Sequence, residues 1–186
     1  MASTLTNPLP LGTQISDFTL LNVINNRMIT LNTYAPEQPL VIVFMSNHCH
    51  FVKHIIHEFV HTATEFQAKG IGFIAICPSD IEHYPEDAPE AMHAFATLHH
   101  FSFPYCSDPT QQVAKQFHAI CTPEIYVLDK HHVCIYHGRF DDSRPNHSPP
   151  VTGHDLITAL NCILTNQPIP EPQIPGLGCT IKWKKC

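Results

Sequence analysis

Ser46-Asn47-His48-Cys49 brings a hydroxyl, an imidazole and a thiol into one short turn. A cysteine thiolate is a nucleophile, so this turn can perform thiol chemistry. The preceding run Leu40–Phe44 is rich in β-branched residues, which predicts a strand buried on both faces. Apolar residues then recur at helical spacing from Phe51 to Phe66, so a long helix begins directly after the turn. In its first turn, unpaired backbone N–H groups and the positive end of the dipole favour the thiolate of Cys49 over the thiol.

A second landmark lies far downstream, where Cys121-Thr122-Pro123-Glu124 leads into another apolar run. Together with the upstream strand, thiol and helix, it resembles the thioredoxin superfamily, in which a cis-proline loop faces the redox cysteines. Further segments are similar to bacterial redoxin-domain proteins related to alkyl hydroperoxide reductase and thiol-specific antioxidant, namely Asp17-Phe18-Thr19-Leu20, residues 138–144 and residues 178–184. The resemblance covers nearly the whole chain. It implies an α/β fold of the thioredoxin-like three-layer α/β/α sandwich type, with an N-terminal β-hairpin.

The sequence departs from these relatives at the redox motif. They usually read Cys-Asn-His-Cys-Pro, whereas this chain has Ser46 in place of the first cysteine and His50 in place of the proline. Exchange by a Cys-x-x-Cys motif needs one sulfur to attack and a second to resolve the mixed disulfide. The motif here has one sulfur, Cys49, so the resemblance implies chemistry through a single active-site cysteine and argues against a dithiol reductase. Alternatively, Cys49 is a buried structural relic.

The spacing Ser46-x-x-Cys49 also resembles the Thr-x-x-Cys of peroxiredoxins, in which the hydroxyl helps to hold the peroxide. Ser46 can supply the same hydrogen bond, since a hydroxyl has one donor and two lone pairs. The peroxide would oxidise Cys49 to a sulfenic acid, which then needs a second thiol. The proline expected four residues before the hydroxyl is Ile42 in this chain, so the resemblance to peroxiredoxins is partial.

Three cysteines are candidates for that second thiol. The residue before the cis-proline faces the redox site in the superfamily, so the resemblance places Cys121 near Cys49, although it can equally be a small residue that ends a strand. Cys179 and Cys186 lie in a tail that can fold back to resolve an oxidised Cys49 or remain exposed. Thr122 and Pro123 are expected to line the substrate groove. The other cysteines fall in strand or helix patterns and are expected in the core: Cys77, Cys106, Cys134 and Cys162.

Four histidines, His50, His54, His57 and His61, share one stripe of the predicted helix. Pairs spaced by four residues can bind Zn²⁺, Ni²⁺ or Cu²⁺, and the nearby Cys49 thiolate could complete such a site. The stripe lies opposite the apolar face, however, so a solvated helix surface is the simpler interpretation. The charged run at residues 139–144 is either a surface ion-pair loop or a border of the site.

Length, composition and charge limit the classes of protein to which the chain can belong. The chain has 186 residues, 44% hydrophobic and 14% charged, which suits one globular domain. The net charge of −6 gives no electrostatic case for nucleic acid or an anionic membrane. No segment approaches the roughly 20 apolar residues that a spanning helix needs. The N-terminus lacks the pattern of a secretory signal, so we expect a cytoplasmic protein. The eight cysteines are therefore expected to be reduced thiols.

Local patterns divide the chain into three parts: an arm at 1–13, a thioredoxin-like domain at 14–167 and an extended, proline-rich tail at 168–186. Within the domain, residues 15–31 predict a β-hairpin, and residues 40–77 predict a strand, a helix and a parallel strand. Helices are expected at 89–99, from 108 to 117 and at 153–164, and a hairpin at 125–136. Residues 84–87 are expected at the tip of a loop.

The predicted function is a thiol-dependent oxidoreductase or antioxidant protein acting through Cys49, with a peroxide or a thiol/disulfide protein as its partner and no cofactor. The alternative is a non-catalytic thioredoxin-fold protein that holds a peptide, a partner thiol or a metal in the groove beside Pro123. The oligomeric state is left open.

Overall fold

The computed structural model describes all residues except 1–2, 7–8, 147–148 and 186. The strands are β1 (Ser3–Leu5), β2 (Thr19–Asn22), β3 (Arg27–Thr30), β4 (Leu40–Phe44), β5 (Gly72–Cys77), β6 (Tyr105–Ser107), β7 (Cys121–Thr122), β8 (Glu124–Leu128), β9 (Cys134–Gly138) and β10 (Leu177–Thr180). The helices are α1 (Leu31–Tyr34), α2 (His50–Gln67), the 3₁₀ turn η1 (Pro85–Asp87), α3 (Pro89–Leu98), α4 (Gln112–Gln116) and α5 (His154–Leu164).

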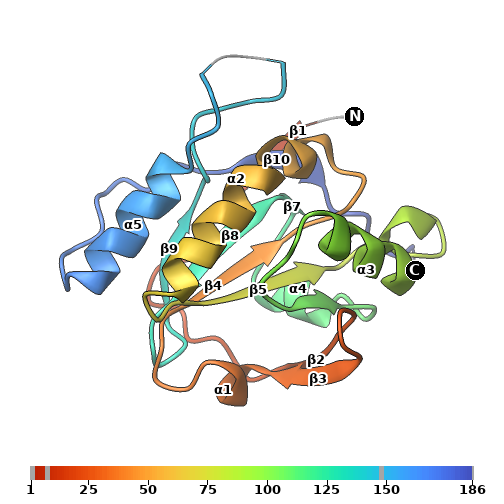
Figure 1. The fold of residues 1–186 in the computed structure, drawn as a ribbon, viewed down its shortest axis with the longest axis horizontal. Helices are drawn as coiled ribbons and strands as arrows, with labels where there is room; N and C mark the ends of the chain where they lie inside the picture. The colour runs from red at the N-terminus through yellow and green to blue at the C-terminus, as the bar shows by residue number, and fades with distance from the viewer. Residues whose placement is uncertain (1–2, 7–8, 147–148, 186) are drawn as a thin grey trace.

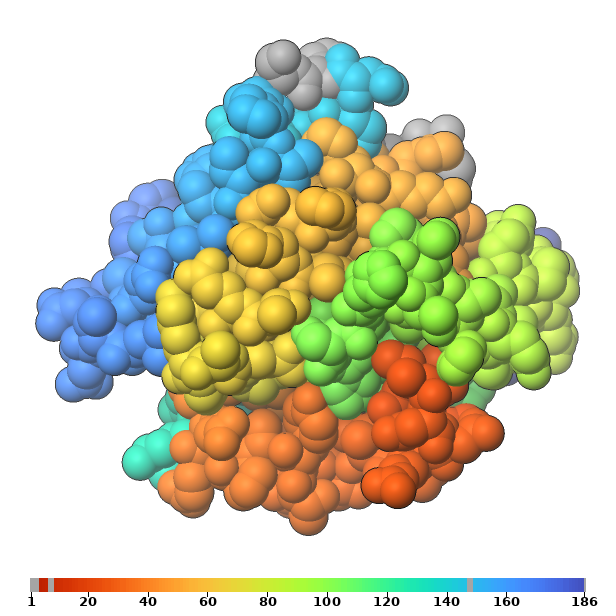
Figure 2. All heavy atoms as spheres, in the orientation of Figure 1, coloured from red at the N-terminus to blue at the C-terminus, as the bar shows by residue number. Residues whose placement is uncertain are grey.

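A seven-stranded sheet in the order β3-β2-β6-β5-β4-β8-β9 forms the middle layer. Strand β4 pairs in parallel with β5 and antiparallel with β8, and all five of its residues are buried. Its side chains alternate between the two faces, so Val41 and Val43 pack with α2, α3 and α5, while Ile42 and Phe44 pack with α1 and α4. Figure 1 shows these layers, and Figure 2 shows α2, α3 and α5 covering one face. The predicted three-layer α/β/α sandwich with an N-terminal β2–β3 hairpin is confirmed.

A second, smaller sheet joins three segments that are far apart in the sequence. Strand β10 lies between β1 and β7 and is antiparallel to both (Figure 1). Within the predicted arm, Ser3–Leu5 is thus a strand, which pairs residue for residue with the tail. Part of the tail is likewise a strand. Since β7 directly precedes Pro123, the small sheet brings β10 to the proline loop.

None of the described helices is long and apolar enough to cross a membrane.

Candidate redox site

Cys49 lies at the junction of the two elements predicted to hold it. It is the N-cap residue of α2, five residues after the end of the fully buried β4. Its side chain is 0% exposed, and its sulfur lies 2.9 Å from the carbonyl oxygen of Thr122. The Thr122–Pro123 peptide bond is cis. Cys49, Thr122 and Pro123 therefore come together, with the thiol packed against the proline loop.

The second sulfur at this site belongs to Cys179 of strand β10. Cys179 pairs across the small sheet with Thr122, and it is 3% exposed. Its sulfur shares a hydrogen bond with the Cys49 thiol and accepts the backbone N–H groups of His50 and Phe51. A sulfur from the tail thus occupies the N-terminal end of α2. The other tail candidate, Cys186, lies outside the described residues.

The pKa values of the two thiols are shifted in opposite directions. The hydrogen bond from Cys49 and the N–H groups of His50 and Phe51 lower the pKa of Cys179 to about 5, although burial acts in the other direction. The hydrogen bond to Cys179, followed by burial, raises the pKa of Cys49 far above its ordinary value. The pKa of Cys49 is thus raised, against the prediction of a lowered one, although the N–H of Val52 and the side chain of Thr122 act in the other direction. The shifts favour the proton on Cys49 and the thiolate on Cys179.

A titration of the thiolate by its ultraviolet absorbance tests this assignment. In the wild-type protein, the absorbance is expected to be present at pH 7 and to disappear as the pH falls through about 5. Cys49→Ala removes the donor, so the thiolate should form only nearer the ~8.5 of a free cysteine. Cys49→Ser keeps a hydroxyl donor and is the matched control, expected to titrate between these limits. A wild-type absorbance that develops only above pH 8 would contradict the assignment.

Cys121, the candidate second thiol before the cis-proline, lies apart from the contact between Cys49 and Cys179. Neighbouring residues of a strand point to opposite faces, so Cys121 points away from the side on which Thr122 meets Cys179. Its sulfur lies 3.9 Å from the carbonyl oxygen of Pro123, and burial together with the Glu124 carboxylate raises its pKa. Among the described residues, Cys179 is the sulfur that hydrogen-bonds to Cys49. A resolving role for Cys121 stays a prediction.

Ser46 faces a buried carboxylate that local sequence patterns did not indicate. Its hydroxyl lies 3.0 Å from Nδ1 of His48, which also lies 3.1 Å from Oδ2 of Asp87. The backbone N–H of Asn47 donates to Asp87 at 2.7 Å. Burial raises the pKa of Asp87, but hydrogen bonds from His48, Ser79 and Ser46 outweigh it and leave the pKa below its ordinary value. Asp87 is fully buried, so the expectation of a loop tip is wrong there, and the Ser46 hydroxyl is engaged by His48, which also contacts this carboxylate.

A second buried carboxylate, Glu124, directly follows the cis-proline. It accepts the backbone N–H groups of Ile120 and Cys121, and it also binds the Tyr126 hydroxyl and Nε2 of His137 at 2.8 and 2.9 Å. Glu124 therefore holds β7 in position next to Cys49. The only sequence signal for this role was an acidic residue at the start of an apolar strand.

The histidine stripe of α2 is mostly a solvated surface. His50, His57 and His61 are exposed, and half-buried His54 places Nε2 3.0 Å from the Ser143 hydroxyl. The described part of the chain contains no group of three or more His, Cys, Asp and Glu side chains that could hold one metal ion. The metal site considered for this stripe thus lacks a ligand set there, and His54 is already engaged.

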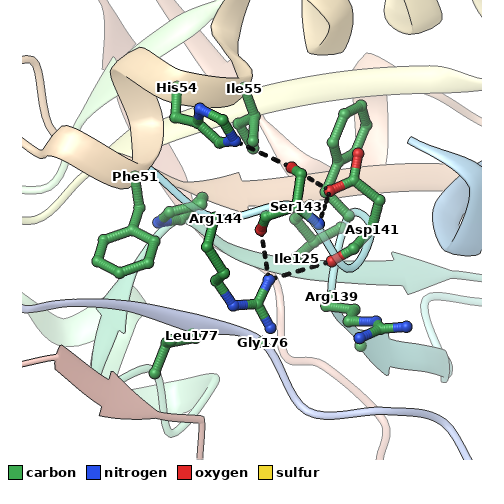
Figure 3. A pocket seen from close by; sticks show the side chains of 13 residues that line it. Phe51, His54, Ile55, Ile125, Arg139, Asp141, Ser143, Arg144, Gly176 and Leu177 are labelled. Atoms are coloured by element: carbon green, nitrogen blue, oxygen red, sulfur yellow. Dashed lines mark hydrogen bonds between the residues drawn. The ribbon is translucent and has the colours of Figure 1, made fainter. Parts of the chain in front are cut away.

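The charged loop at residues 139–144 lines one cavity together with Pro123. Figure 3 shows Asp141, Ser143 and Arg144 of this loop joined by hydrogen bonds. Asp141 organises it by accepting the backbone N–H groups of Ser143, Thr152 and Gly153. Arg144 donates to the carbonyl oxygens of Asp141 and Ser143. Together with Phe51, Pro123 and Leu177, the loop lines a cavity of about 30 Å³. This placement favours a border of the site over an isolated surface loop.

The fold and the two landmarks define a thioredoxin-fold protein in which a cysteine at the start of a long helix packs against a cis-proline loop. Residues 11–137 match the model of the AhpC/TSA family, and the chain belongs to that family. No curated protein sequence matches the chain.

Two solved structures of uncharacterised proteins are similar over nearly the full length. An uncharacterized conserved protein from Geobacillus kaustophilus is 45% identical, with a TM-score of 0.97 over 100% of this chain and 98% of that one. A hypothetical protein from Sinorhizobium meliloti 1021 is 34% identical, with a TM-score of 0.95 over 98% of this chain and 100% of that one. A peroxidoxin from Mycobacterium tuberculosis, 21% identical with a TM-score of 0.55 over 67% of this chain and 82% of that one, shares the fold.

Proposed function

We propose that the protein is a thiol-dependent oxidoreductase that reduces peroxides with Cys49 and Cys179 as its two redox sulfurs. The observation that carries the proposal is the contact between these sulfurs at the N-terminus of α2. One sulfur is held as the thiolate, the nucleophilic form, and the other keeps its proton. Membership of the AhpC/TSA family supports a redox role of the thioredoxin-like type.

The proposed chemistry has two steps. The Cys179 thiolate attacks one peroxide oxygen, the O–O bond breaks, and Cys179 becomes a sulfenic acid while the other oxygen leaves and takes a proton from solvent. The sulfur of Cys49 then attacks the oxidised sulfur, so an S–S bond forms, the S–O bond breaks, and the Cys49 proton leaves with the hydroxyl as water. A dithiol donor regenerates both thiols, in the cytoplasm by our proposal.

Treatment of the reduced protein with one equivalent of hydrogen peroxide tests the two steps. The intact mass is expected to fall by two hydrogen atoms, and non-reducing peptide mapping should join the segments that contain Cys49 and Cys179. In Cys49→Ser the reaction should stop at a sulfenic acid on Cys179, which dimedone labels. A cross-link between other cysteines, or a dimedone label on Cys49 of the wild-type protein with Cys179 unmodified, would contradict the scheme.

The burial of both sulfurs favours a second candidate function, a non-catalytic protein that holds a partner segment in the groove beside Pro123. This alternative predicts stable capture of a partner and no peroxide consumption above that of a free thiol. Repeated peroxide turnover with a dithiol donor that is lost in Cys49→Ser would exclude it.

A further inference from the structure

Strand β10 occupies the edge of β7 beside the cis-proline in the way an added peptide strand would. Cys179 pairs with Thr122 and Thr180 pairs with Cys121, both antiparallel, and the N–H of Ile181 donates to the carbonyl oxygen of Ile120 at 2.9 Å. Addition of an extended segment to a sheet edge uses main-chain hydrogen bonds for affinity and side-chain fit for specificity. The main-chain N–H and C=O groups at this edge of β7 are thus hydrogen-bonded by the chain's own tail.

Side-chain fit at this edge is strict at one position. A Cβ atom built on Gly178 would lie 2.2 Å from the carbonyl oxygen of Thr122 and 2.6 Å from its carbonyl carbon. Both atoms are backbone, so they cannot rotate away, and any residue other than glycine would push the two strands apart. The residue directly before the sulfur-bearing position must therefore be glycine.

The next position carries the sulfur to the redox centre. Cys179 follows Gly178, and its sulfur meets the Cys49 thiol and the N–H groups of His50 and Phe51. The groove thus selects for three features: an extended backbone, a glycine and a cysteine. The tail supplies all of them within the single dipeptide Gly178-Cys179 of β10.

The tail is attached in a way that permits exchange. Strand β10 is four residues long and pairs with two residues of β7 and three of β1. The segment that leads to it contains Pro168, Pro170, Pro172 and Pro175, which cannot donate backbone hydrogen bonds. Further backbone hydrogen bonds fix its flanks, from Thr6 to Gly176, from Ile181 to Ile120 and from Asp80 to Lys182, and these must break together with the strand pairs before another strand can take its place.

We propose that the groove accepts, in place of β10, an extended segment of a partner protein that carries Gly-Cys with the cysteine in a disulfide. The inference rests on the proposed role of Cys49 and Cys179 as the redox pair. The Cys49 thiolate attacks the segment's sulfur, the segment's former partner sulfur leaves as a thiolate, and the Cys49 proton passes to solvent. Cys179 then attacks Cys49, forms the Cys49–Cys179 disulfide and releases the segment as a thiol. The returning β10 both resolves the mixed disulfide and displaces the product.

Two activated peptides test the proposal on the full-length Cys179→Ser protein. One has the sequence of residues 175–183 with its cysteine in a mixed disulfide with thionitrobenzoate, and the control has alanine in place of the glycine that corresponds to Gly178. The glycine peptide is expected to form a mixed disulfide with Cys49 at least about tenfold faster than the control, equivalent to ~1.4 kcal/mol. Proteolytic mapping identifies the modified cysteine, and half-buried Cys162 reports non-specific reaction. In the Gly178→Ala, Cys179→Ser double variant the tail competes poorly, so the glycine peptide should react faster still.

Equal rates for the two peptides at Cys49, or reaction at Cys162 with none at Cys49, would overturn the inference. Formation of the Cys49–Cys179 disulfide by hydrogen peroxide in the wild-type protein is measured separately. If that disulfide forms and the peptides fail to discriminate, the peroxide chemistry stands and the strand-recognition proposal falls. If the peptides discriminate and peroxide forms no disulfide, the strand-recognition proposal stands and the peroxide chemistry falls.

Discussion

Replacing Cys179 by serine is expected to reduce peroxide-dependent turnover by at least about 10³-fold, since loss of a nucleophile costs a comparable or larger factor in enzymes that use one. The reason is that Cys179 carries the thiolate stabilised by the Cys49 thiol and by the first N–H groups of α2. The measurement is the initial rate of hydrogen peroxide consumption with a dithiol donor present.

Two further variants make this result specific. Cys162→Ser, on the outer part of α5, is the neutral control and should retain the wild-type rate. Cys121→Ser separates the two candidates for the second sulfur, because Cys121 faces the Glu124 carboxylate and is not in contact with Cys49. Turnover that survives Cys179→Ser but is lost in Cys121→Ser would show that the pairing expected from the resemblance operates in solution.

The second large effect concerns stability. Glu124→Ala is expected to lower the free energy of unfolding by about 3–5 kcal/mol, as is typical when one member of a buried, hydrogen-bonded pair is removed. The carboxylate is 1% exposed, and its loss leaves two backbone N–H groups, a tyrosine hydroxyl and an imidazole without their partner. Urea denaturation followed by circular dichroism measures the difference.

An exposed carboxylate in the neighbouring loop provides the control for charge alone. Asp142→Ala should change the free energy of unfolding by less than about 0.5 kcal/mol, as expected of a surface position. Glu124→Gln preserves the size of the side chain and should fall between the two. A loss below about 1 kcal/mol in Glu124→Ala would mean that the buried network is not a structural support of β7.

The parts of the fold that the sequence predicted are those specified by local periodicity. Strand β4 is a short β-branched run and α2 has one continuous apolar stripe, so both elements and their junction at Cys49 follow from neighbouring residues. The β2–β3 and β8–β9 hairpins follow for the same reason. Thr122-Pro123 was identified through the resemblance, and the structure places it against Cys49.

The features that were missed depend on contacts between distant segments. Strand β10 has no alternating pattern, and it exists because β1 and β7 supply pairing partners on either side. The pKa assignment failed for a related reason: helix N–H groups stabilise whichever sulfur stands in front of them, and Cys179 reaches that place only through the small sheet. Asp87 lies among polar loop residues, where local composition suggests exposure, but Ser46, Asn47 and His48 enclose it.

The attachment of one redox sulfur to β10 sets the order in which the site is assembled during synthesis. Once Gly138 has emerged, every strand of the seven-stranded sheet has been made, and Cys49 can be packed in its final place. At 5–20 residues per second, a ribosome needs roughly 2–8 s to make the following stretch of roughly 40 residues up to Cys179. During that interval the nascent chain has Cys49 without the sulfur of Cys179 beside it. The Cys49–Cys179 disulfide could therefore form only when the tail docks.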